Sequence, residues 1–312
     1  MKKTITLLTF SLVVLFVAAQ QDQQFSQFMY NKLSFNPGYA GTNQSICATA
    51  MYRMQWMNFP GAPKSGLFSV DAPSRILHGG LGLTVLHDQL GNDKSLFARG
   101  AYSFHQPIGV GLLGIGLGVG MIQKTMVFNW IPPGGPSTVG PDQAIPNNQE
   151  SSITYDLDFG AYYSTSKLYV GLAVTHLPEQ SVKKNELNYG VARHYFVMAG
   201  YTFNINSDFD IIPNLLVKSD AKSTIFDVNV TGMYQKMVWL GASYRMTDAI
   251  AAMLGYQKDF GKNNLKIGVA YDFTMSEIKN HSSGSPEIFV GYCMKVDPKV
   301  KTHSNINPRF LK

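Results

Sequence analysis

The sequence predicts an all-β protein, a single antiparallel transmembrane β-barrel of about 14 strands. The first observation is a series of short stretches, between residues 45 and 296, in which apolar and polar residues alternate. The second is that the connectors between these stretches alternate between short and long. The third is an N-terminus that reads as an export signal. An even-numbered antiparallel meander behind an export signal is typical of bacterial outer-membrane barrels.

The N-terminal residues predict export. Lys2 and Lys3 precede an apolar run over residues 5–17, which ends in Ala18-Ala19. This pattern predicts a cleaved signal peptide over residues 1–19. The run is too short to span a bilayer as a helix, and no later segment approaches about 18 continuous apolar residues. We therefore exclude a helical inner-membrane protein and expect an outer-membrane location.

The composition favours a lipid-exposed barrel over a soluble domain. Charged residues make up 15% of the chain and aromatic residues 12%, whereas soluble domains usually carry about 25% charge. Without Lys2 and Lys3 the mature chain has 24 basic and 20 acidic residues, a net charge of +4. The basic residues are scattered, which argues against a nucleic-acid partner. We expect the lipid bilayer of the outer membrane as the first partner.

The alternation divides the chain into a lead-in, a barrel and a tail. The clearest stretch is 95–106, where one face is apolar and the other mostly polar. Residues 20–44 are expected to form a periplasmic lead-in, 45–296 the barrel and 297–312 a periplasmic C-terminal tail. The predicted strands are 45–58, 64–72, 78–88, 95–106, 109–128, 153–164, 167–177, 194–206, 209–219, 224–235, 237–247, 249–260, 264–276 and 286–296.

The connector lengths predict how the barrel is oriented. The three long connectors, 129–152, 178–193 and 277–285, each follow an odd-numbered predicted strand, so all three lie at the same end of the barrel. Because outer-membrane barrels have short periplasmic turns and longer external loops, we expect these long loops to face the outside.

The face opposite the apolar one is predicted to line the lumen. Its charges either pair with one another or select solutes in an aqueous pore, and both readings stay open. They are Arg53, Arg99, Asp156, Asp158, Asp227, Arg245, Lys266 and Asp272. A row of glycines at period two, residues 114–120, is expected to face the lumen and to allow either the close approach of a plug or a sharp curvature of the wall. The sequence GVGLLG at 109–114 matches a dinucleotide fingerprint, but it opens a strand rather than a helix, so we reject that reading.

The cysteines and histidines give few chemical signals. Cys47 and Cys293 lie in the first and last predicted strands and share the inward parity. The alternatives are two free, half-buried thiols or a seam pair that the oxidising periplasm could join as a disulfide. The seven histidines form no spaced metal motif, and His87-Asp88 is the only adjacent acid–base pair. We therefore expect no enzyme activity, no cofactor and no metal.

The most specific sequence words lie within residues 24–73, and a further one lies near the C-terminus. They are QFSQFMYN at residues 24–31, NPGYAG at 36–41, YRMQW at 52–56, GAP at 61–63, SVDAP at 69–73 and NPRF at 307–310. In these words the chain resembles the PorP/SprF family of the Bacteroidota, outer-membrane proteins associated with the type IX secretion system and gliding motility. The residues that we single out as a candidate partner or plug signature are Phe25, Asn31, Asn36, Pro37, Gly38, Tyr39, Gly41, Arg53 and Trp56.

The resemblance implies a non-enzymatic barrel. Such a barrel would partner a large secreted adhesin-like protein through the cargo's C-terminal domain, and would assist its secretion or its anchoring at the cell surface for gliding or adhesion. Components of the secretion system's periplasmic ring are further partners that it implies. From the residues themselves we expect the Asn36-Pro37-Gly38 turn to pin the N-terminal segment inside the periplasmic mouth. The alternative is an outer-membrane channel or hydrophobic-solute transporter, and occlusion of the lumen would distinguish the two.

Overall fold

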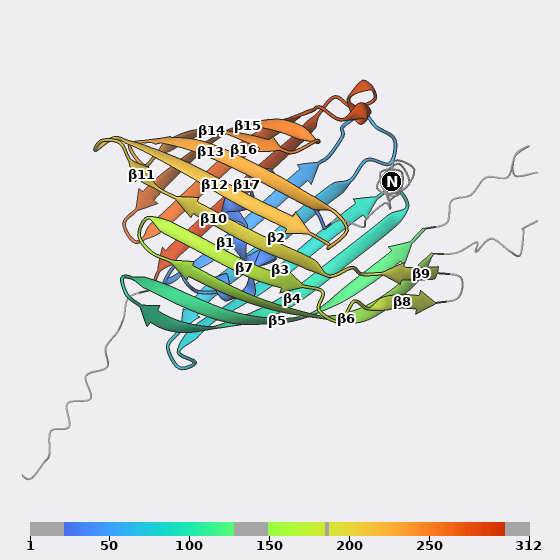
Figure 1. Ribbon diagram of the computed structural model, residues 1–312, viewed down its shortest axis with the longest axis horizontal. Coiled ribbons are helices and arrows are strands. Elements are labelled where there is room, and N and C mark those ends of the chain that lie inside the picture. Colours follow the sequence, from blue (N-terminus) through green and yellow to red (C-terminus); the bar gives the residue numbers. More distant parts are fainter. Residues whose placement is uncertain (1–21, 128–148, 185–186, 297–312) are drawn as a thin grey trace, which may run out of the picture.

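The protein is a closed antiparallel β-barrel of 14 strands, seen in a computed structural model that describes residues 22–127, 149–184 and 187–296 (Figure 1). The barrel strands are β1 (Ser45–Met54), β2 (Lys64–Ser74), β3 (Gly79–Leu90), β4 (Asp93–Ile108), β5 (Gly111–Met126), β6 (Glu150–Ser164), β7 (Leu168–Thr175), β10 (His194–Tyr201), β12 (Phe209–Ser219), β13 (Thr224–Tyr234), β14 (Val238–Arg245), β15 (Ala249–Phe260), β16 (Asn263–Thr274) and β17 (Ser285–Lys295). A separate hairpin is formed by β8 (Ser181–Lys184) and β9 (Leu187–Gly190), and the two-residue β11 (Phe203–Asn204) pairs with β12. No helix within the described ranges is long and apolar enough to cross a membrane.

The barrel closes between its first and last strands. β1 pairs antiparallel with β17, and β10 pairs directly with β12. The predicted fold class is confirmed, and every predicted barrel strand has a counterpart. The predicted first strand, 45–58, is too long because the backbone turns at Trp56 and Asn58, which have φ of 53° and 72°. These left-handed conformations are incompatible with a continuing strand. The predicted signal peptide, 1–19, and tail, 297–312, lie outside the described residues.

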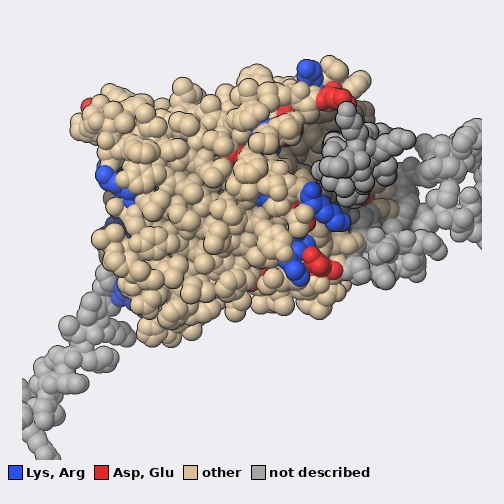
Figure 2. Space-filling view, viewed as in Figure 1, with Lys and Arg blue, Asp and Glu red and all other residues tan. Residues whose placement is uncertain are grey.

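The outer face of the barrel is apolar. In β5 the side chains of Ile115, Leu117, Val119 and Met121 are 42–63% exposed. In the face seen in Figure 2, Lys, Arg, Asp and Glu leave most of the wall free and lie mainly towards the two ends of the barrel. In a bilayer this surface is in contact with lipid chains, as the alternation predicts for a membrane barrel.

The two ends of the barrel differ in their connectors. The connectors that follow β5, β7 and β16 lie at one end, which we call the long-loop end. The tight turns after β4, β13 and β15 lie at the other, the short-turn end. The chain enters β1 and leaves β17 at the short-turn end. The predicted segregation of loop lengths is confirmed.

The N-terminal segment lies inside the barrel (Figure 1). We call residues 22–44 the plug. It contains η1 (Phe28–Tyr30), the single-turn helix α2 (Lys32–Phe35) and η2 (Pro37–Tyr39). Its first described residue, Asp22, contacts His176 beyond the long-loop end of β7, and it joins β1 at the short-turn end. The prediction of a periplasmic lead-in is therefore wrong in extent, because the segment follows the lumen from one end to the other.

Apolar side chains of the plug pack against inward-facing side chains of the wall. One cluster joins Phe28 and Phe35 to Tyr162, Phe196 and Met198. A second contains Phe25, Met51, Leu67, Trp239 and Phe289. The lumen thus contains a hydrophobic core, and burial of each large apolar side chain contributes about 1.5–3 kcal/mol to holding the plug in place.

Candidate functional site

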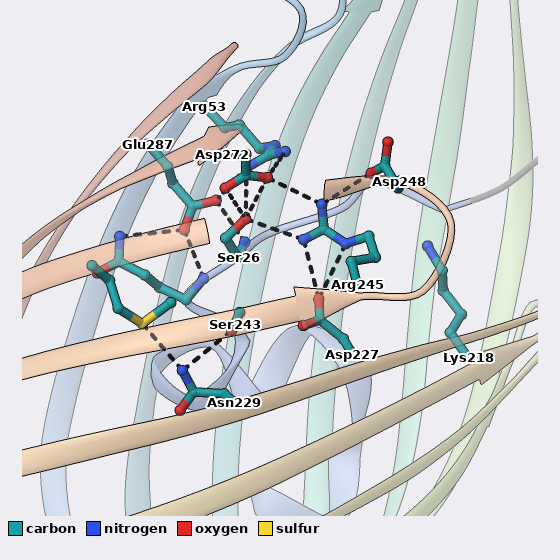
Figure 3. Close-up of polar contacts among 12 residues, drawn as sticks. Ser26, Arg53, Lys218, Asp227, Asn229, Ser243, Arg245, Asp248, Asp272 and Glu287 are labelled. Atoms are coloured by element: carbon teal, nitrogen blue, oxygen red, sulfur yellow. Dashed lines mark hydrogen bonds and ion pairs between the residues drawn. The ribbon is translucent and has the colours of Figure 1, made fainter. Parts of the chain in front are cut away.

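Ser26 of the plug is the centre of a buried polar network (Figure 3). Its hydroxyl donates to the Asp272 carboxylate, with O–O distances of 2.6 and 2.8 Å. Its backbone N–H donates to Glu287 Oε2 at 2.7 Å, and the N–H of Gln27 donates to Glu287 Oε1 at 2.9 Å. Hydrogen bonds to charged groups are shorter and stronger than neutral ones. The network therefore fastens the plug to β16 and β17.

Two buried arginines of the wall complete this network (Figure 3). Arg53 of β1 forms ion pairs with Asp272 at 2.6 Å and with Glu287 at 3.2 Å. Arg245 of β14 forms ion pairs with Asp272 and Asp227, each at 3.1 Å. Both guanidinium groups also donate to the Ser26 hydroxyl oxygen, at 2.9 and 3.1 Å. The buried charges are paired, as buried charges must be if the fold is to be stable.

A second ion-pair group lies across the lumen. Arg99 of β4 pairs with Asp156 at 3.7 Å and with Asp158, both in β6. It also donates to the carbonyl oxygen of Ser34 in α2 at 2.9 Å. Of the two readings left open for the lumen charges, mutual pairing is the one seen for Arg53, Arg99 and Arg245. The exception, Lys266, forms no ion pair within the described part of the chain and is considered below.

The start of the plug is held by two histidines and a lysine. His176 lies between two carboxylates: Nε2 is 3.2 Å from Asp22 and Nδ1 is 2.9 Å from Asp156. Lys218 Nζ donates to the Asp22 carbonyl oxygen at 2.7 Å, and the Asp22 N–H points at His194 Nε2. Burial alone would lower the pKa of His176, but the carboxylates of Asp22 and Asp156 raise it to about 10. Burial alone would raise the pKa of Asp22, but His176 and His194 hold it well below its ordinary value.

This arrangement also has the spacing of metal ligands. One ligand atom from each of Asp22, His176 and His194 lies within 4.8 Å of the others, and the same holds for Asp156, Asp158 and His176. A histidine ligand must offer a neutral imidazole nitrogen. With a pKa of about 10, His176 is protonated at neutral pH and offers none. The groups fit a set of ion pairs between His176 and the carboxylates of Asp22 and Asp156, which we call the clasp, better than a metal centre.

The Asn36-Pro37-Gly38 turn docks on the inner wall near the short-turn end. The Asn36 side chain accepts from the Gly38 N–H at 2.8 Å. Its amide nitrogen donates to the carbonyl oxygens of Ala161 in β6 and Leu172 in β7, at 3.0 and 3.2 Å. Pro37 is buried and opens η2. The turn therefore uses its polar side chain to bind the backbone of two wall strands.

The glycine lane of β5 receives this turn. A Cβ built on Gly38 would lie 2.8 Å from the carbonyl oxygen of Gly114 and 2.9 Å from that of Gly160. A Cβ on Gly116 would lie 2.4 Å from the backbone of Pro37 and Gly38. Gly114, Gly116 and Gly118 are buried, and the apolar residues between them face outward. The predicted lumen-facing lane that lets a plug approach closely is what the structure shows.

The last turn of the plug is tied to β2 and β4. Gly41 has φ of +70°, a conformation that favours glycine, and its N–H donates to Asp71 at 2.9 Å. Tyr39 packs edge-on against Tyr162, with ring centroids 5.2 Å apart. His105 is 2.9 Å from the Ala40 carbonyl oxygen. These contacts fix where the plug leaves the lumen.

The remaining signature residues divide between the plug and the rim. Phe25 is buried against Trp239 and Phe289, and Asn31 is buried between η1 and α2. Arg53 is part of the Ser26 network. Trp56 is not part of it: this residue lies half-buried in the loop after β1, where its backbone N–H donates to Ser285 Oγ at 3.0 Å. The structure therefore brings the signature together in the lumen except for Trp56.

The cysteines face each other across the closing seam. Cys47 and Cys293 are directly paired in the β1–β17 register, with Cα atoms 4.1 Å apart, and are joined by a disulfide. Of the two sequence alternatives, the seam pair is the one that the structure shows. His87 and Asp88, by contrast, do not form an acid–base pair: His87 is exposed on the outer side, whereas Asp88 accepts from Ser65 Oγ at 2.6 Å.

Several residues of the site were missed by sequence reasoning. Glu287 could have been found, because it shares the inward parity of Cys293 in the last strand. No sequence pattern marks His176 or Asp22 as part of a site, because only the folded chain brings both of them close to Asp156. Ser26 belongs to a signature word, but nothing in that word marks it as the centre of a charge network.

Taken together, a closed 14-stranded barrel with an apolar outer face and a lumen occupied by its own N-terminal segment defines an outer-membrane β-barrel protein with an internal plug. The sequence pattern of one family, type IX secretion system membrane protein PorP/SprF, matches residues 17–292. The chain belongs to this family. It is an outer-membrane protein, and its long-loop end therefore faces the cell exterior.

Similar solved structures support the fold. The CymD monoaromatic hydrocarbon channel matches with a TM-score of 0.51 and 10% sequence identity, covering 86% of this chain and 93% of that one. The toluene transporter TodX of Pseudomonas putida matches with a TM-score of 0.50 and 9% identity, covering 85% and 93%. At this identity the likeness shows the barrel fold alone. No curated protein sequence matches the chain.

Proposed function

We propose that this barrel holds a type IX-secreted, adhesin-like cargo, assisting its secretion or its anchoring at the cell surface for gliding or adhesion. The observation that carries the proposal is the occupied lumen, in which Ser26, Arg53 and Arg245 tie the plug to the wall through buried charge-assisted hydrogen bonds. Membership of the type IX secretion family supports a role in secretion rather than in solute uptake.

The arginines of the lumen hold the plug in place and are not free to interact with passing solutes. A water-filled channel needs lining charges that remain free to interact with passing solutes. Here the inward charges Arg53, Arg99 and Arg245 are 2–11% exposed in their side chains and each contacts both a wall carboxylate and the plug. A barrel built in this way is a rigid platform, which suits a fixed anchor for a large partner.

We propose that the role is non-enzymatic and that the partner is bound through its C-terminal domain. The plug reaches both ends of the barrel, so a cargo domain at the exterior or a periplasmic ring component could each contact residues that belong to it. We further propose that residues 1–19 act as a cleaved export signal.

Deletion of the gene tests this proposal. The quantity to measure is the amount of type IX-secreted, adhesin-like protein on intact cells and in the medium. We expect it to move from the cell surface to the medium or to be lost, and to return when the wild-type gene is restored. Unchanged surface display would contradict the proposal.

A second bacterial strain, which carries a deletion variant of the barrel, tests the role of the plug. Deletion of residues 24–41 removes the part of the plug that crosses the lumen but leaves all 14 strands. We expect less barrel in the outer membrane or loss of cargo attachment, with the level of an unrelated outer-membrane barrel as the control. A stable barrel with full cargo attachment would count against a role for the plug.

The alternative, a channel for hydrophobic solutes, has only the fold likeness to CymD and TodX in its favour. That likeness carries no information on what this chain transports.

A further inference from the structure

A cavity of about 280 Å³ remains between the plug and the wall at the short-turn end. The plug contributes η1 and α2 to its lining, and the wall contributes the ends of β1, β15, β16 and β17 nearest the periplasm. None of the plug-anchoring networks described above fills it. Two features of its lining point to a ligand.

The first feature is a pair of lysines without a carboxylate partner. Lys32 of α2 and Lys266 of β16 both line the cavity, and among the described residues neither has a carboxylate within ion-pairing distance. Lys32 Nζ donates to Tyr162 Oη at 3.2 Å and lies 3.5 Å from the centroid of the Tyr169 ring. Lys266 Nζ lies 5.9 Å from the centroid of the Tyr30 ring. Aromatic contacts stabilise the two cations without neutralising them.

The second feature is an amide with no partner. Asn31 also lines the cavity and is 1% exposed, yet neither its side-chain nitrogen nor its side-chain oxygen has a hydrogen-bond partner. A buried polar group left unsatisfied costs about 1–3 kcal/mol. This amide nitrogen lines the same cavity as the two lysines and is a further donor for the same kind of ligand.

The charge balance of the cavity is positive. Asp71 is the carboxylate among its lining residues, and its oxygen accepts the Gly41 N–H at 2.9 Å. Burial, and then the charge of Lys266, lower the pKa of Lys32 to about 7. An anion between the two lysines would offset both effects.

We propose that this cavity is a binding site for a small oxyanion, a carboxylate or a phosphate, held between Lys32 of the plug and Lys266 of the wall. The Asn31 amide donates a third hydrogen bond. Because one cation belongs to the plug and the other to the barrel, the ligand joins the two parts at the periplasmic side. The site does not depend on the cargo role proposed above.

Titration of the purified full-length barrel with inorganic phosphate and, separately, with acetate tests the site. Line broadening in phosphorus-31 and carbon-13 NMR reports binding, with chloride used to hold the ionic strength constant. The expected result is saturable binding. If phosphate and acetate both bind and compete with each other, the cavity is a general oxyanion site. If only one of them binds, the site is specific for that class of ligand.

Three variants locate the binding. Lys266→Gln removes the wall cation, and Asn31→Asp replaces an amide that has no partner with a repelling carboxylate of the same shape. Each is expected to weaken binding roughly tenfold, the size of a lost charge-assisted hydrogen bond. Lys258→Gln is the matched control, because Lys258 lies one position after Gln257, the strand partner of Lys266, and its Nζ lies over the Phe260 ring outside the cavity. No saturable binding of either anion, or equal binding by wild type, Lys266→Gln and Asn31→Asp, would overturn the proposal.

Discussion

At the scale of single residues, Gly38 is required by the space around it. The carbonyl oxygens of Gly114 and Gly160 leave no room for a methyl group at this position. We expect Gly38→Ala to lower the free energy of unfolding by about 1–3 kcal/mol, the usual cost of overpacking. Urea unfolding in micelles measures it. Gly100→Ala is the control, since a Cβ there would meet only the Val119 carbonyl oxygen at 3.9 Å. Equal effects of the two substitutions would contradict the tight docking of the turn.

The clasp between Asp22 and His176 predicts a pH dependence. The raised pKa of His176 contributes stability that is complete below its ordinary value of 6.5 and is lost as the pH rises towards 10. The lowered pKa of Asp22 contributes stability that is present above 3.8 and is lost in acid. We expect the free energy of unfolding to decline from pH 6.5 to 10, and His176→Gln to remove this slope. His281→Gln, at an exposed histidine before β17, serves as the control; a slope that survives in His176→Gln would exclude the clasp.

Some of these residues were predictable and others were not. The glycine lane and the inward charges follow from the two-residue period of a strand, which the sequence shows directly. The partners of those charges do not follow, because Ser26 and Asp272 are 246 positions apart and only the folded plug brings them together. Trp56 was misplaced because a positive φ in a non-glycine residue leaves no mark in the alternation.

At the scale of elements, the Ser26 network is an electrostatic contact between the plug and strands β1, β14, β16 and β17. Arg53→Met removes one partner of two buried ion pairs and leaves Glu287 and Asp272 with fewer donors. Loss of one partner of a buried pair costs about 3–5 kcal/mol, so we expect a decrease of this size in the free energy of unfolding. Arg193→Met is the control, because Arg193 and Glu179 are 34% and 55% exposed and such pairs contribute little. A small effect of Arg53→Met would mean that the network does not anchor the plug.

The seam between β1 and β17 is a covalent element as well as a hydrogen-bonded one. The Cys47–Cys293 disulfide links residues 246 positions apart, and we expect its loss in a Cys47→Ser, Cys293→Ser double variant to destabilise the barrel by about 2–4 kcal/mol. Mass spectrometry after iodoacetamide treatment of the unfolded protein checks the bond itself. We expect no labelling without reductant and two labels with it; labelling of unreduced protein would show free thiols.

The strands themselves were largely predictable, and the plug was not. Alternation locates a strand because every second side chain faces lipid, and connector length gives the orientation. Residues 22–44 have no such period: their three short helical turns are held by contacts with nearly every part of the wall. The sequence could predict that this segment docks at the periplasmic mouth but not that it extends to the long-loop end.

At the scale of the whole molecule, the barrel and its N-terminal segment form one structure. The outer face binds lipid, the inner face binds the plug, and the ends are left for partners. This division explains why the lumen of a transmembrane barrel contains large apolar side chains such as Trp239 and Phe289. It is the physical basis for proposing an anchor rather than a pore.

Ion conductance in planar lipid bilayers tests this central claim most directly. The purified wild-type barrel is compared with a variant that lacks residues 24–41, after circular dichroism has shown that both retain their strands. The account predicts that the wild-type barrel stays closed to ions while the deletion variant conducts, because the lumen then loses its occupant. Steady conductance by the wild-type barrel, equal to that of the deletion variant, would contradict it.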